Sequence, residues 1–579
     1  MKKDEMNETT KKSIRKINID DLPKSDDQTA DLKGDTQVWD DLPLEDEFEF
    51  HPDYDEMGFF EDDFAKEPVS RKKTSKASEE TTSEKTSGKR RIKKIQLTPE
   101  EIQERKEVQK KRRSQNPEIL AVTYTFVALF VLMIGYFVYF NAFVSKDVIN
   151  SAYNVRINSF EETVTRGSIV SNDGTVLAET LTDENGNETR YYPMGRIFAH
   201  AIGTSEINQS GVELSQNFYM LQSNGNPIWN LIRDIQGEKN PGDRVVTTLD
   251  ASLQEVAYNA LGYNDGAVVA IEPSTGKVLA MVSKPDYNPN TLVSDYESII
   301  ADENNNSLLN KATSGLFVPG SIFKTFTSLA YMRSGANTDN YSYLCEGRIN
   351  LGGDDYITCF NQTVHGEEDF IDSFAYSCNA SFGNIGLSLK KDQLKDTCES
   401  LFFNNKLPTD IMHKKSVFDL SSDASNWQIA ATSIGQGHTQ VTPLHMAMVV
   451  SAIANGGNLM KPYMVDSIET ADGGRRVEKY LPESYGQIMT TQEANALGEL
   501  MEAVTSYGTA YSLSDYGYSV AGKTGTAEVA GKGDNSWFVG YAPADQPKIA
   551  ICVLVENDEG YYESALPVAN AIFQNYMNR

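Results

Sequence analysis

Ser321 and Lys324 are the first residues whose types and spacing could do chemistry. They open a stretch with apolar residues at helical spacing, so both side chains would share one face of a helix. A serine in the first helical turn would lie beside unpaired backbone N–H groups, which can stabilise an oxyanion. A lysine among phenylalanines would lose hydration, which lowers its pKa and lets the neutral amine act as a base. The pair alone is weak, because other serines in the chain also precede a lysine at this spacing.

Two further motifs follow Ser321 in the chain: Ser377-Cys378-Asn379, and the run Lys523, Thr524, Gly525 and Thr526. A second hydroxyl and an amide could relay a proton and hold a peptide carbonyl. A lysine on an edge strand could meet a carboxylate, and Gly525 would let a substrate backbone approach closely. The order S-x-x-K, S-x-N, K-T-G is the signature of penicillin-recognising serine acyltransferases.

The elements around these motifs predict one antiparallel sheet packed against helices. Gly266–Ile271 and Lys277–Val282 flank a turn and are typical of a hairpin. Ser536–Tyr541 and Lys548–Val555 are predicted as two more strands. The C-terminal apolar residues have helical spacing: Leu566, Ala569, Ile572, Phe573 and Tyr576.

An uncharged stretch from Ile119 to Val144 is long enough to cross a membrane as a helix. Lysines and arginines precede it, so the positive-inside rule places the N-terminus in the cytoplasm and the rest of the chain outside. Because it does not lie at the extreme N-terminus, we expect an uncleaved anchor in a single-pass membrane protein.

The 579 residues carry 53 Lys and Arg against 82 Asp and Glu, a net charge of −29, which argues against nucleic acid as a ligand. Residues 1 to about 100 are polar and highly charged, acidic first and then basic, and we expect them to be disordered. A short charged helix is predicted from about Pro99 to Arg113.

The region 145–579 resembles a class B penicillin-binding protein, a monofunctional peptidoglycan D,D-transpeptidase of the compact type with a short pedestal domain. Besides the three motifs, the resemblance includes Arg166-Gly167-Ser168-Ile169, Gly211-Val212-Glu213, Ile434–Gly437 and Trp537–Gly540. The expected organisation is a disordered cytoplasmic tail (1–117), an anchor (118–144), a pedestal (145–255) and a transpeptidase domain (256–579).

The resemblance implies an α/β (α+β) fold of the penicillin-binding/β-lactamase type, with a central antiparallel sheet flanked by helices. Ser321 would attack the stem peptide, Lys324 would take its proton, and Ser377 would relay a proton. Asn379 would hold the acyl-side amide. Backbone N–H groups of Ser321 and Thr526 would form the oxyanion hole, while Lys523, Thr524 and Thr526 would bind the terminal carboxylate.

The implied partners are peptidoglycan stem peptides, β-lactams and a membrane glycosyltransferase, with no cofactor and no metal. Two alternatives stay open. A D,D-carboxypeptidase or β-lactamase would pass the acyl group to water. A catalytically silent scaffold of a cell-wall polymerase complex would keep the fold without the chemistry.

Other patterns are weaker. Gly517–Thr524 matches a phosphate-binding loop but lacks a plausible following helix. Residues 45–51 resemble a glycosyltransferase motif, but the spacing of the motif residues is wrong.

Cys345 and Cys359 could form a disulfide, remain two buried thiols, or bind a metal with Asp354, Asp355 and His365. Cys378 is predicted to pack away from the pocket, and His438 and His445 to be structural.

Overall fold

The computed structural model describes residues 98–113, 117–140, 160–514, 516–529, 533–558 and 565–579. Residues 1–97 and 114–116 of the predicted disordered tail therefore lie outside the described residues. Residues 141–144 of the predicted anchor lie outside them as well. Residues 1–109 and 110–579 form two separate units.

Two helices precede the folded part of the chain. Helix α1 (Pro99–Arg113) has the predicted bounds, and its first turn is stabilised by Thr98, whose hydroxyl accepts from the Glu101 N–H. Helix α2 (Pro117–Tyr139) contains the candidate span Leu120–Tyr139, with a mean hydropathy of 2.1 and no part of it buried against protein. The span Leu120–Tyr139 has no charged residue and is long and apolar enough to cross a membrane, which suggests a single membrane anchor.

A five-stranded antiparallel sheet forms the centre of the folded part, in the order β17-β18-β19-β7-β8. The predicted hairpin and the two predicted late strands are all in it. The bounds are β7 (Gly266–Ile271), β8 (Val278–Lys284), β17 (Ala521–Ala527), β18 (Asp534–Ala542) and β19 (Ile549–Asp558). Because β17 is at the edge, one side of its backbone is free to face other groups.

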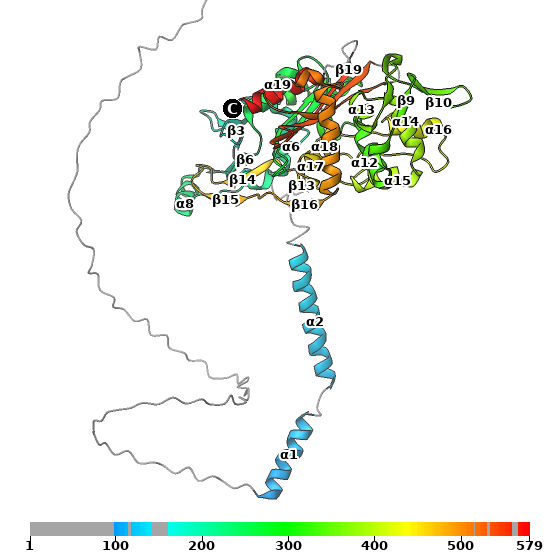
Figure 1. The fold of residues 1–579 in the computed structure, drawn as a ribbon. Helices are drawn as coiled ribbons and strands as arrows, with labels where there is room; N and C mark the ends of the chain where they lie inside the picture. Colours follow the sequence, from blue (N-terminus) through cyan, green and yellow to red (C-terminus); the bar gives the residue numbers. More distant parts are fainter. Residues whose placement is uncertain (1–97, 114–116, 141–159, 515, 530–532, 559–564) are drawn as a thin grey trace, which may run out of the picture. The chain divides into compact units, whose positions relative to one another are not determined.

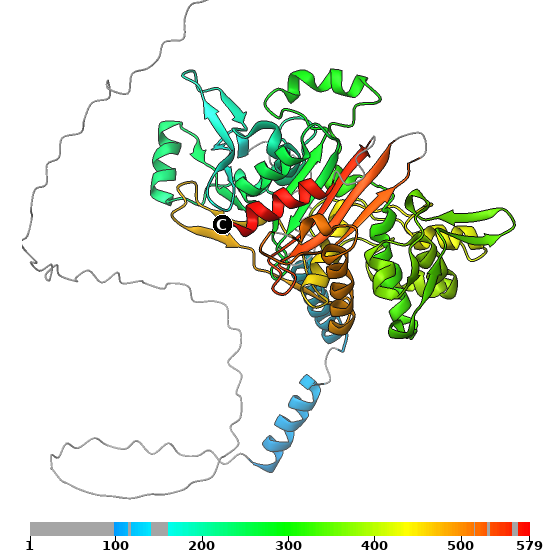
Figure 2. The ribbon, with the colours of Figure 1, turned by 45° about the horizontal axis from the view of Figure 1, so that its top comes forward.

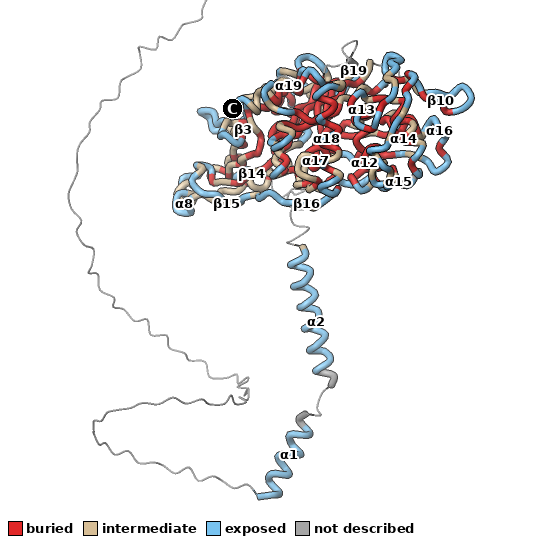
Figure 3. The backbone as a smooth tube through the Cα atoms, in the orientation of Figure 1, coloured by how far each residue is buried: buried red, intermediate tan, exposed pale blue. Residues whose placement is uncertain are grey.

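Helices cover both faces of this sheet (Figures 1 and 2). One face contacts α17 (Pro443–Ala454) and α18 (Thr491–Ser506), and the other contacts α9 (Ala251–Leu261) and the predicted C-terminal helix α19 (Ala565–Met577). Every residue of β7 and β8 is buried, which explains why β7 is apolar throughout and β8 is apolar up to Val282. Figure 3 shows the buried core running through these layers.

A second, six-stranded sheet supports the pedestal, in the order β15-β14-β6-β2-β3-β4. Four of its strands come from the predicted pedestal and two from after residue 460: β2 (Ile169–Val170), β3 (Val176–Thr182), β4 (Glu188–Tyr191), β6 (Arg244–Thr247), β14 (Val465–Glu469) and β15 (Arg476–Lys479). The buried carboxylate of Glu213 lies 2.6 Å from Arg166 and 2.7 Å from Arg190, which joins the two predicted pedestal motifs.

The segment between the central strands forms a lobe beside β17, on the side away from the pedestal (Figures 1 and 2). Its helices are α12 (Lys324–Arg333), α13 (Phe370–Ala375), α14 (Asn379–Ser388), α15 (Lys391–Ser400) and α16 (Asn426–Ser433). Two small antiparallel strand pairs complete it, β9 (Tyr343–Cys345) with β12 (Gly366–Glu368), and the hairpin of β10 (Arg348–Gly352) with β11 (Asp355–Thr358).

The remaining elements are short. The helices are α5 (Ala199–Ile202), α6 (Gly211–Ser215), α7 (Asn217–Met220), α8 (Pro227–Gln236), α10 (Leu292–Ala301) and α11 (Lys311–Ser314). The 3-10 helices are η3 (Gly195–Phe198), η4 (Gly320–Phe323), η5 (Thr338–Asn340), η6 (Phe360–Gln362) and η7 (Tyr511–Leu513). Two further strand pairs are β1 (Val164–Thr165) with β5 (Asn240–Pro241) and β13 (Asn458–Met460) with β16 (Ser484–Gln487).

Candidate active site

Ser321 lies in the 3-10 helix η4, directly before α12, and not in the first turn of an α-helix as predicted. The turn is held against the edge strand. Gly320 has a φ of +55°, its N–H donates to the Gly435 carbonyl at 2.9 Å, and a Cβ on it would lie 2.3 Å from the Thr526 carbonyl oxygen. Only glycine fits there, so the sequence before Ser321 fixes the serine beside β17.

The Ser321 side chain is partly exposed, as a nucleophile that meets a substrate must be. Nothing in the described part of the chain hydrogen-bonds its hydroxyl. The indole N–H of Trp537 donates to the Val318 carbonyl at 3.1 Å, and this bond connects the segment before Ser321 to β18. The Trp537–Gly540 motif therefore supports the turn that carries the serine.

Lys324 is fully buried and points to the S-x-N motif. Its Nζ donates to the Ser377 carbonyl at 2.6 Å, the Ser377 hydroxyl at 3.1 Å and the Asn379 Oδ1 at 2.7 Å. The Asn379 amide in turn donates to the Thr358 carbonyl at 3.0 Å. Three predicted site residues therefore form one hydrogen-bonded group.

Ser377 joins this group to the edge strand. The Lys523 Nζ donates to the Ser377 hydroxyl at 2.9 Å, so one hydroxyl oxygen is within hydrogen-bonding distance of both buried lysines. The backbone of Ser377 has a φ of +57°, an unfavourable conformation for serine that its surroundings must hold in place. Its neighbours supply this restraint: the Ser377 N–H donates to the Phe374 carbonyl and the Cys378 N–H to the Ser373 carbonyl.

Burial sets the electrostatics of the two lysines. It lowers the pKa of Lys324 to about 8, and the neighbouring Cys378, Cys359 and Glu368 oppose this shift. Burial also lowers the pKa of Lys523 well below its usual value, and the charge of Lys324 lowers it further. A buried amine that loses its proton near pH 8 can serve as a base.

Strand β17 places Thr524 and Thr526 beside the Ser321 turn, and both side chains are partly exposed. The Thr524 hydroxyl lies 2.6 Å from the hydroxyl of Thr509, which follows α18. The sequence analysis missed Thr509, because an isolated threonine far from the motifs carries no signal of its own. The Thr509 N–H donates to the Ala375 carbonyl, so the residue also contacts the segment that leads to Ser377.

Gly525 lies close to the turn that carries Ser321. A Cβ there would lie 2.9 Å from the Ile322 Cγ2, 3.1 Å from the Ile322 nitrogen and 3.2 Å from the Pro319 carbonyl oxygen. The glycine therefore lets β17 pack against η4, and its role toward a substrate backbone stays a prediction.

Two other predictions concern residues near the motifs. The segment after Gly522 is strand β17 and not a helix, so Gly517–Thr524 is not a phosphate-binding loop. His445 is buried, lies 2.7 Å from the Ser416 hydroxyl and 2.6 Å from the Leu401 carbonyl, and burial lowers its pKa to about 4, in keeping with a structural role.

Cys345 and Cys359, behind the site, are buried free thiols, which is one of the predicted alternatives. The Sγ atoms of Cys345 and Cys359 lie 3.6 Å apart, beyond the roughly 2.05 Å of a disulfide bond. Cys378, predicted only to pack, lies with its Sγ 3.7 Å from that of Cys359, and His365 Nδ1 lies 3.4 Å from the Cys345 Sγ. Asp354 and Asp355 are exposed and take no part in this cluster.

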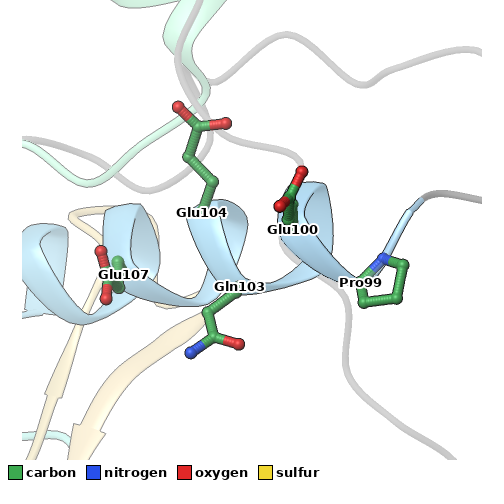
Figure 4. A pocket seen from close by; sticks show the side chains of 5 residues that line it. All are labelled: Pro99, Glu100, Gln103, Glu104 and Glu107. Carbon is green, nitrogen blue, oxygen red and sulfur yellow. The ribbon is translucent and has the colours of Figure 1, made fainter.

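A shallow hollow on α1 is lined by five side chains of that helix alone (Figure 4). Three of them are glutamates, and they are exposed: Glu100, Glu104 and Glu107. The hollow contains none of the site residues that the sequence predicts.

Comparison with known proteins identifies the family. The sequence profile of the "Penicillin binding protein transpeptidase domain" matches residues 266–578. The chain belongs to the penicillin-binding protein transpeptidase family. It is 30% identical to the peptidoglycan D,D-transpeptidase PbpA of Mycolicibacterium smegmatis over 469 residues, 76% of this chain and 94% of that protein. PbpA of Mycobacterium tuberculosis is 28% identical over 488 residues, covering 79% of this chain and 98% of its own.

Solved structures of penicillin-binding proteins agree with this assignment. The imipenem acyl-enzyme complex of penicillin-binding protein A from M. tuberculosis matches with a TM-score of 0.66 and 27% identity, covering 72% of this chain and 99% of that one. The D,D-transpeptidase domain from Eggerthella lenta matches with a TM-score of 0.65 and 29% identity over the same shares. The predicted fold class and family are confirmed.

Proposed function

We propose that this protein is a membrane-anchored peptidoglycan D,D-transpeptidase that works through an acyl group on Ser321. The observation that carries the proposal is the Ser377 hydroxyl, which lies within hydrogen-bonding distance of Lys523 and of Lys324, the residue that directly follows the turn with Ser321. Relatives named peptidoglycan D,D-transpeptidase support the substrate, and the acyl-enzyme complexes of penicillin-binding protein A support binding of β-lactams.

Acylation begins at Ser321. Its oxygen attacks the penultimate D-alanine carbonyl of a stem pentapeptide, and its proton passes to the neutral Lys324. Lys324 donates to three acceptors in the structure, so it must lose a proton and free its lone pair before it can accept this one. Ser377 then relays a proton to the departing D-alanine amine, and the acyl-serine bond replaces the peptide bond.

The oxyanion is bound by the backbone N–H groups of Ser321 and Thr526. The Thr526 carbonyl faces η4, and in an extended strand the N–H of the same residue points to the same side. Donors of this kind are worth about 3 to 4 kcal/mol each in the transition state.

The remaining motif residues bind the substrate. Asn379 holds the acyl-side amide, and Lys523 with Thr524 and Thr526 receives the terminal carboxylate of the stem peptide or of a β-lactam. Both threonine side chains are partly exposed beside the serine, as a carboxylate-binding group requires. A second stem peptide's amine then attacks the acyl-serine, which releases Ser321 and forms the cross-link.

The anchor places this chemistry at a membrane. We propose that the N-terminus is cytoplasmic, because six lysines and arginines precede α2 between residues 105 and 113, and that the catalytic domain lies outside. A membrane glycosyltransferase that polymerises the glycan is the proposed partner. The tail (1–117), anchor (118–144), pedestal (145–255) and transpeptidase domain (256–579) are the proposed organisation.

The test is acylation of the full-length protein in detergent by a fluorescent penicillin, followed by peptide mapping. We expect a stable label on the peptide that contains Ser321 and none in Ser321→Ala. Ser328→Ala, a buried serine of α12 outside the hydrogen-bonded group, is the matched control and should label normally. Rapid turnover of the penicillin would instead indicate the β-lactamase alternative, and no label on folded wild type would indicate the silent scaffold.

A further inference from the structure

Helix α8 (Pro227–Gln236) of the pedestal presents its apolar side chains to the outside. Four of them, here called the α8 stripe, are between 58% and 78% exposed: Ile228, Trp229, Leu231 and Ile235. No residue of the helix is buried, and Figures 1 and 3 show it at an outer edge of the folded part. A helix at a protein surface normally turns such side chains toward the core, so α8 has the opposite orientation.

The polar side of α8 holds it to the pedestal. The Asn230 side chain donates to the Ser223 carbonyl and to the Ser223 hydroxyl, both at 3.2 Å. The Asp234 carboxylate accepts from the Asn240 amide at 2.7 Å. Because successive residues of a helix are rotated by about 100°, Asn230 and Asp234 lie on the side away from the α8 stripe. Specific hydrogen bonds therefore fix the helix with its apolar side outward.

The chain enters the pedestal beside the end of α8. Residues 141–159 separate the described end of the anchor helix, Phe140, from Phe160, where the folded part begins. A fully extended chain of this length spans no more than about 70 Å. Lys239, three residues after α8, donates to the Glu161 carbonyl at 2.6 Å, and β5, which follows α8, pairs with β1. The membrane is therefore within one tether length of the α8 stripe.

The chemistry of this surface fits a lipid bilayer. Aliphatic side chains on one side of a helix enter the acyl region, and tryptophan prefers the level of the headgroups. Arg233 lies one turn from Trp229, and the exposed Arg475 donates to the Asn224 carbonyl just before α8. These cations flank the α8 stripe, where anionic headgroups would meet it. The bilayer is also the apolar phase that the anchor itself brings within reach.

We propose that α8 lies in the lipid–water interface, with the α8 stripe inserted among the acyl chains and the polar side facing the pedestal. The protein then contacts the membrane twice, through the anchor and through α8. Strands β14 and β15, which follow residue 460, belong to the pedestal sheet, so the second contact also restrains the transpeptidase domain. The catalytic domain would keep one orientation to the bilayer instead of turning freely about its tether. This inference does not rest on the proposed function.

The test uses the full-length protein, one copy in each nanodisc, in a bilayer of phosphatidylcholine and phosphatidylglycerol wide enough to lie under the whole folded part. Ile235→Cys carries an environment-sensitive NBD fluorophore, which labels selectively because the five native cysteines are buried. Ile300→Cys is the matched control, since Ile300 is also an exposed isoleucine of a short helix, α10. We expect lipids with a spin label high on the acyl chain to quench the probe at position 235 at least twofold and to leave the probe at position 300 unchanged.

A second pair of variants tests whether the α8 stripe itself makes the contact. Leu231→Asp places a charge in the stripe, and we expect it to abolish the quenching of the probe at position 235. Leu344→Asp makes the same change at a similarly exposed leucine of the lobe and should leave the quenching unchanged. Labelling of each sample by fluorescent penicillin reports separately on the fold and on Ser321. Quenching without any labelling would overturn the proposed function alone.

Three results would overturn the inference. A water-like NBD emission from position 235 would show that α8 stays in solvent. A blue-shifted emission that spin-labelled lipid does not quench would show that protein covers the helix, and its appearance only with two copies in a nanodisc would identify a second copy of this chain. Equal quenching in Leu231→Asp and Leu344→Asp would show that the α8 stripe does not hold the helix at the bilayer.

Discussion

Lys324 and Lys523 show how single residues acquire reactivity from their surroundings. Each is a fully buried lysine without a carboxylate partner among the described ion pairs, and each donates to the same serine hydroxyl. Burial and mutual repulsion disfavour two charges so close together, so one of the two lysines is readily deprotonated. The residue types were predictable from sequence, but this arrangement depends on a fold that joins three distant segments.

The pH dependence of acylation follows from the pKa of Lys324. The folded-state value of about 8 lies below the usual 10.5, so the neutral, basic form increases as the pH rises through 8. We expect the acylation rate constant to rise about tenfold per unit below pH 7.5 and to level off above pH 8.5. The measurement is stopped-flow acylation by penicillin from pH 6 to 9.5. Lys324→Arg, which stays protonated, should not acylate at any of these values, and a flat wild-type profile would contradict Lys324 as the base.

The next prediction concerns Thr509, a site residue that could not be recognised from the sequence. Its hydroxyl lies 2.6 Å from that of Thr524 and so orients a proposed carboxylate-binding group. Thr509→Val keeps the shape but removes the hydrogen bond, worth about 1 kcal/mol, so we expect penicillin to acylate about fivefold more slowly. The loss should appear in apparent affinity rather than in the limiting rate. Thr509→Ser retains the hydroxyl and should behave as wild type, and equal behaviour of both variants would disprove the orienting role.

At the scale of elements, long periodic segments were predictable and the junctions between them were not. Helix α1 has its predicted bounds and β7 agrees residue for residue, because each has a strong local pattern. The turn at Ser321 was expected as an α-helix, yet it is a 3-10 helix, because Gly320, Gly435 and β17 constrain its start. Local apolar spacing cannot report such long-range contacts.

Gly320 tests how η4 and β17 fit together. Alanine at a φ of +55° costs about 1 to 2 kcal/mol, and its Cβ would also meet the Thr526 carbonyl at 2.3 Å. Gly335 has a φ of +81° with no atom within 4 Å of a Cβ, so Gly335→Ala carries the backbone cost alone. We expect Gly320→Ala to acylate at least a hundredfold more slowly and Gly335→Ala to acylate normally, although both lower the Tm. Equal acylation would show that the contact does not position Ser321.

At the scale of the whole molecule, buried ion pairs of Glu213 with Arg166 and Arg190 connect separate segments of the pedestal. Burial alone would raise the pKa of Glu213, but the charges of Arg190 and Arg166 hold it below its usual 4.5. Its stabilising contribution is therefore complete above about pH 4.5 and is lost as the pH falls through the lower folded value. The motifs Arg166–Ile169 and Gly211–Glu213 were both recognised in the sequence, but only the fold shows that they are in contact.

Removing this carboxylate should destabilise the protein strongly. Glu213→Ala would leave two largely buried guanidinium groups unpaired, which costs about 3 to 5 kcal/mol. Glu483→Ala removes an ion pair in which the glutamate is 67% exposed, and should cost less than about 1 kcal/mol. Urea unfolding of the full-length variants in detergent checks both values. Equal midpoints would mean that the buried pair contributes no more than a surface one.

The orientation of the anchor decides whether the site can reach its substrate at all. We expect residues before α2 to be cytoplasmic and Tyr263, which is fully exposed, to lie outside. Since all five native cysteines are buried, an introduced cysteine can be labelled selectively. A membrane-impermeant maleimide should label Tyr263→Cys on intact cells stripped of wall, and Ser75→Cys only after the membrane is permeabilised. The reverse pattern would place Ser321 in the cytoplasm, on the wrong side of the membrane for cross-linking, and would refute the proposed function regardless of how well the isolated protein binds penicillin.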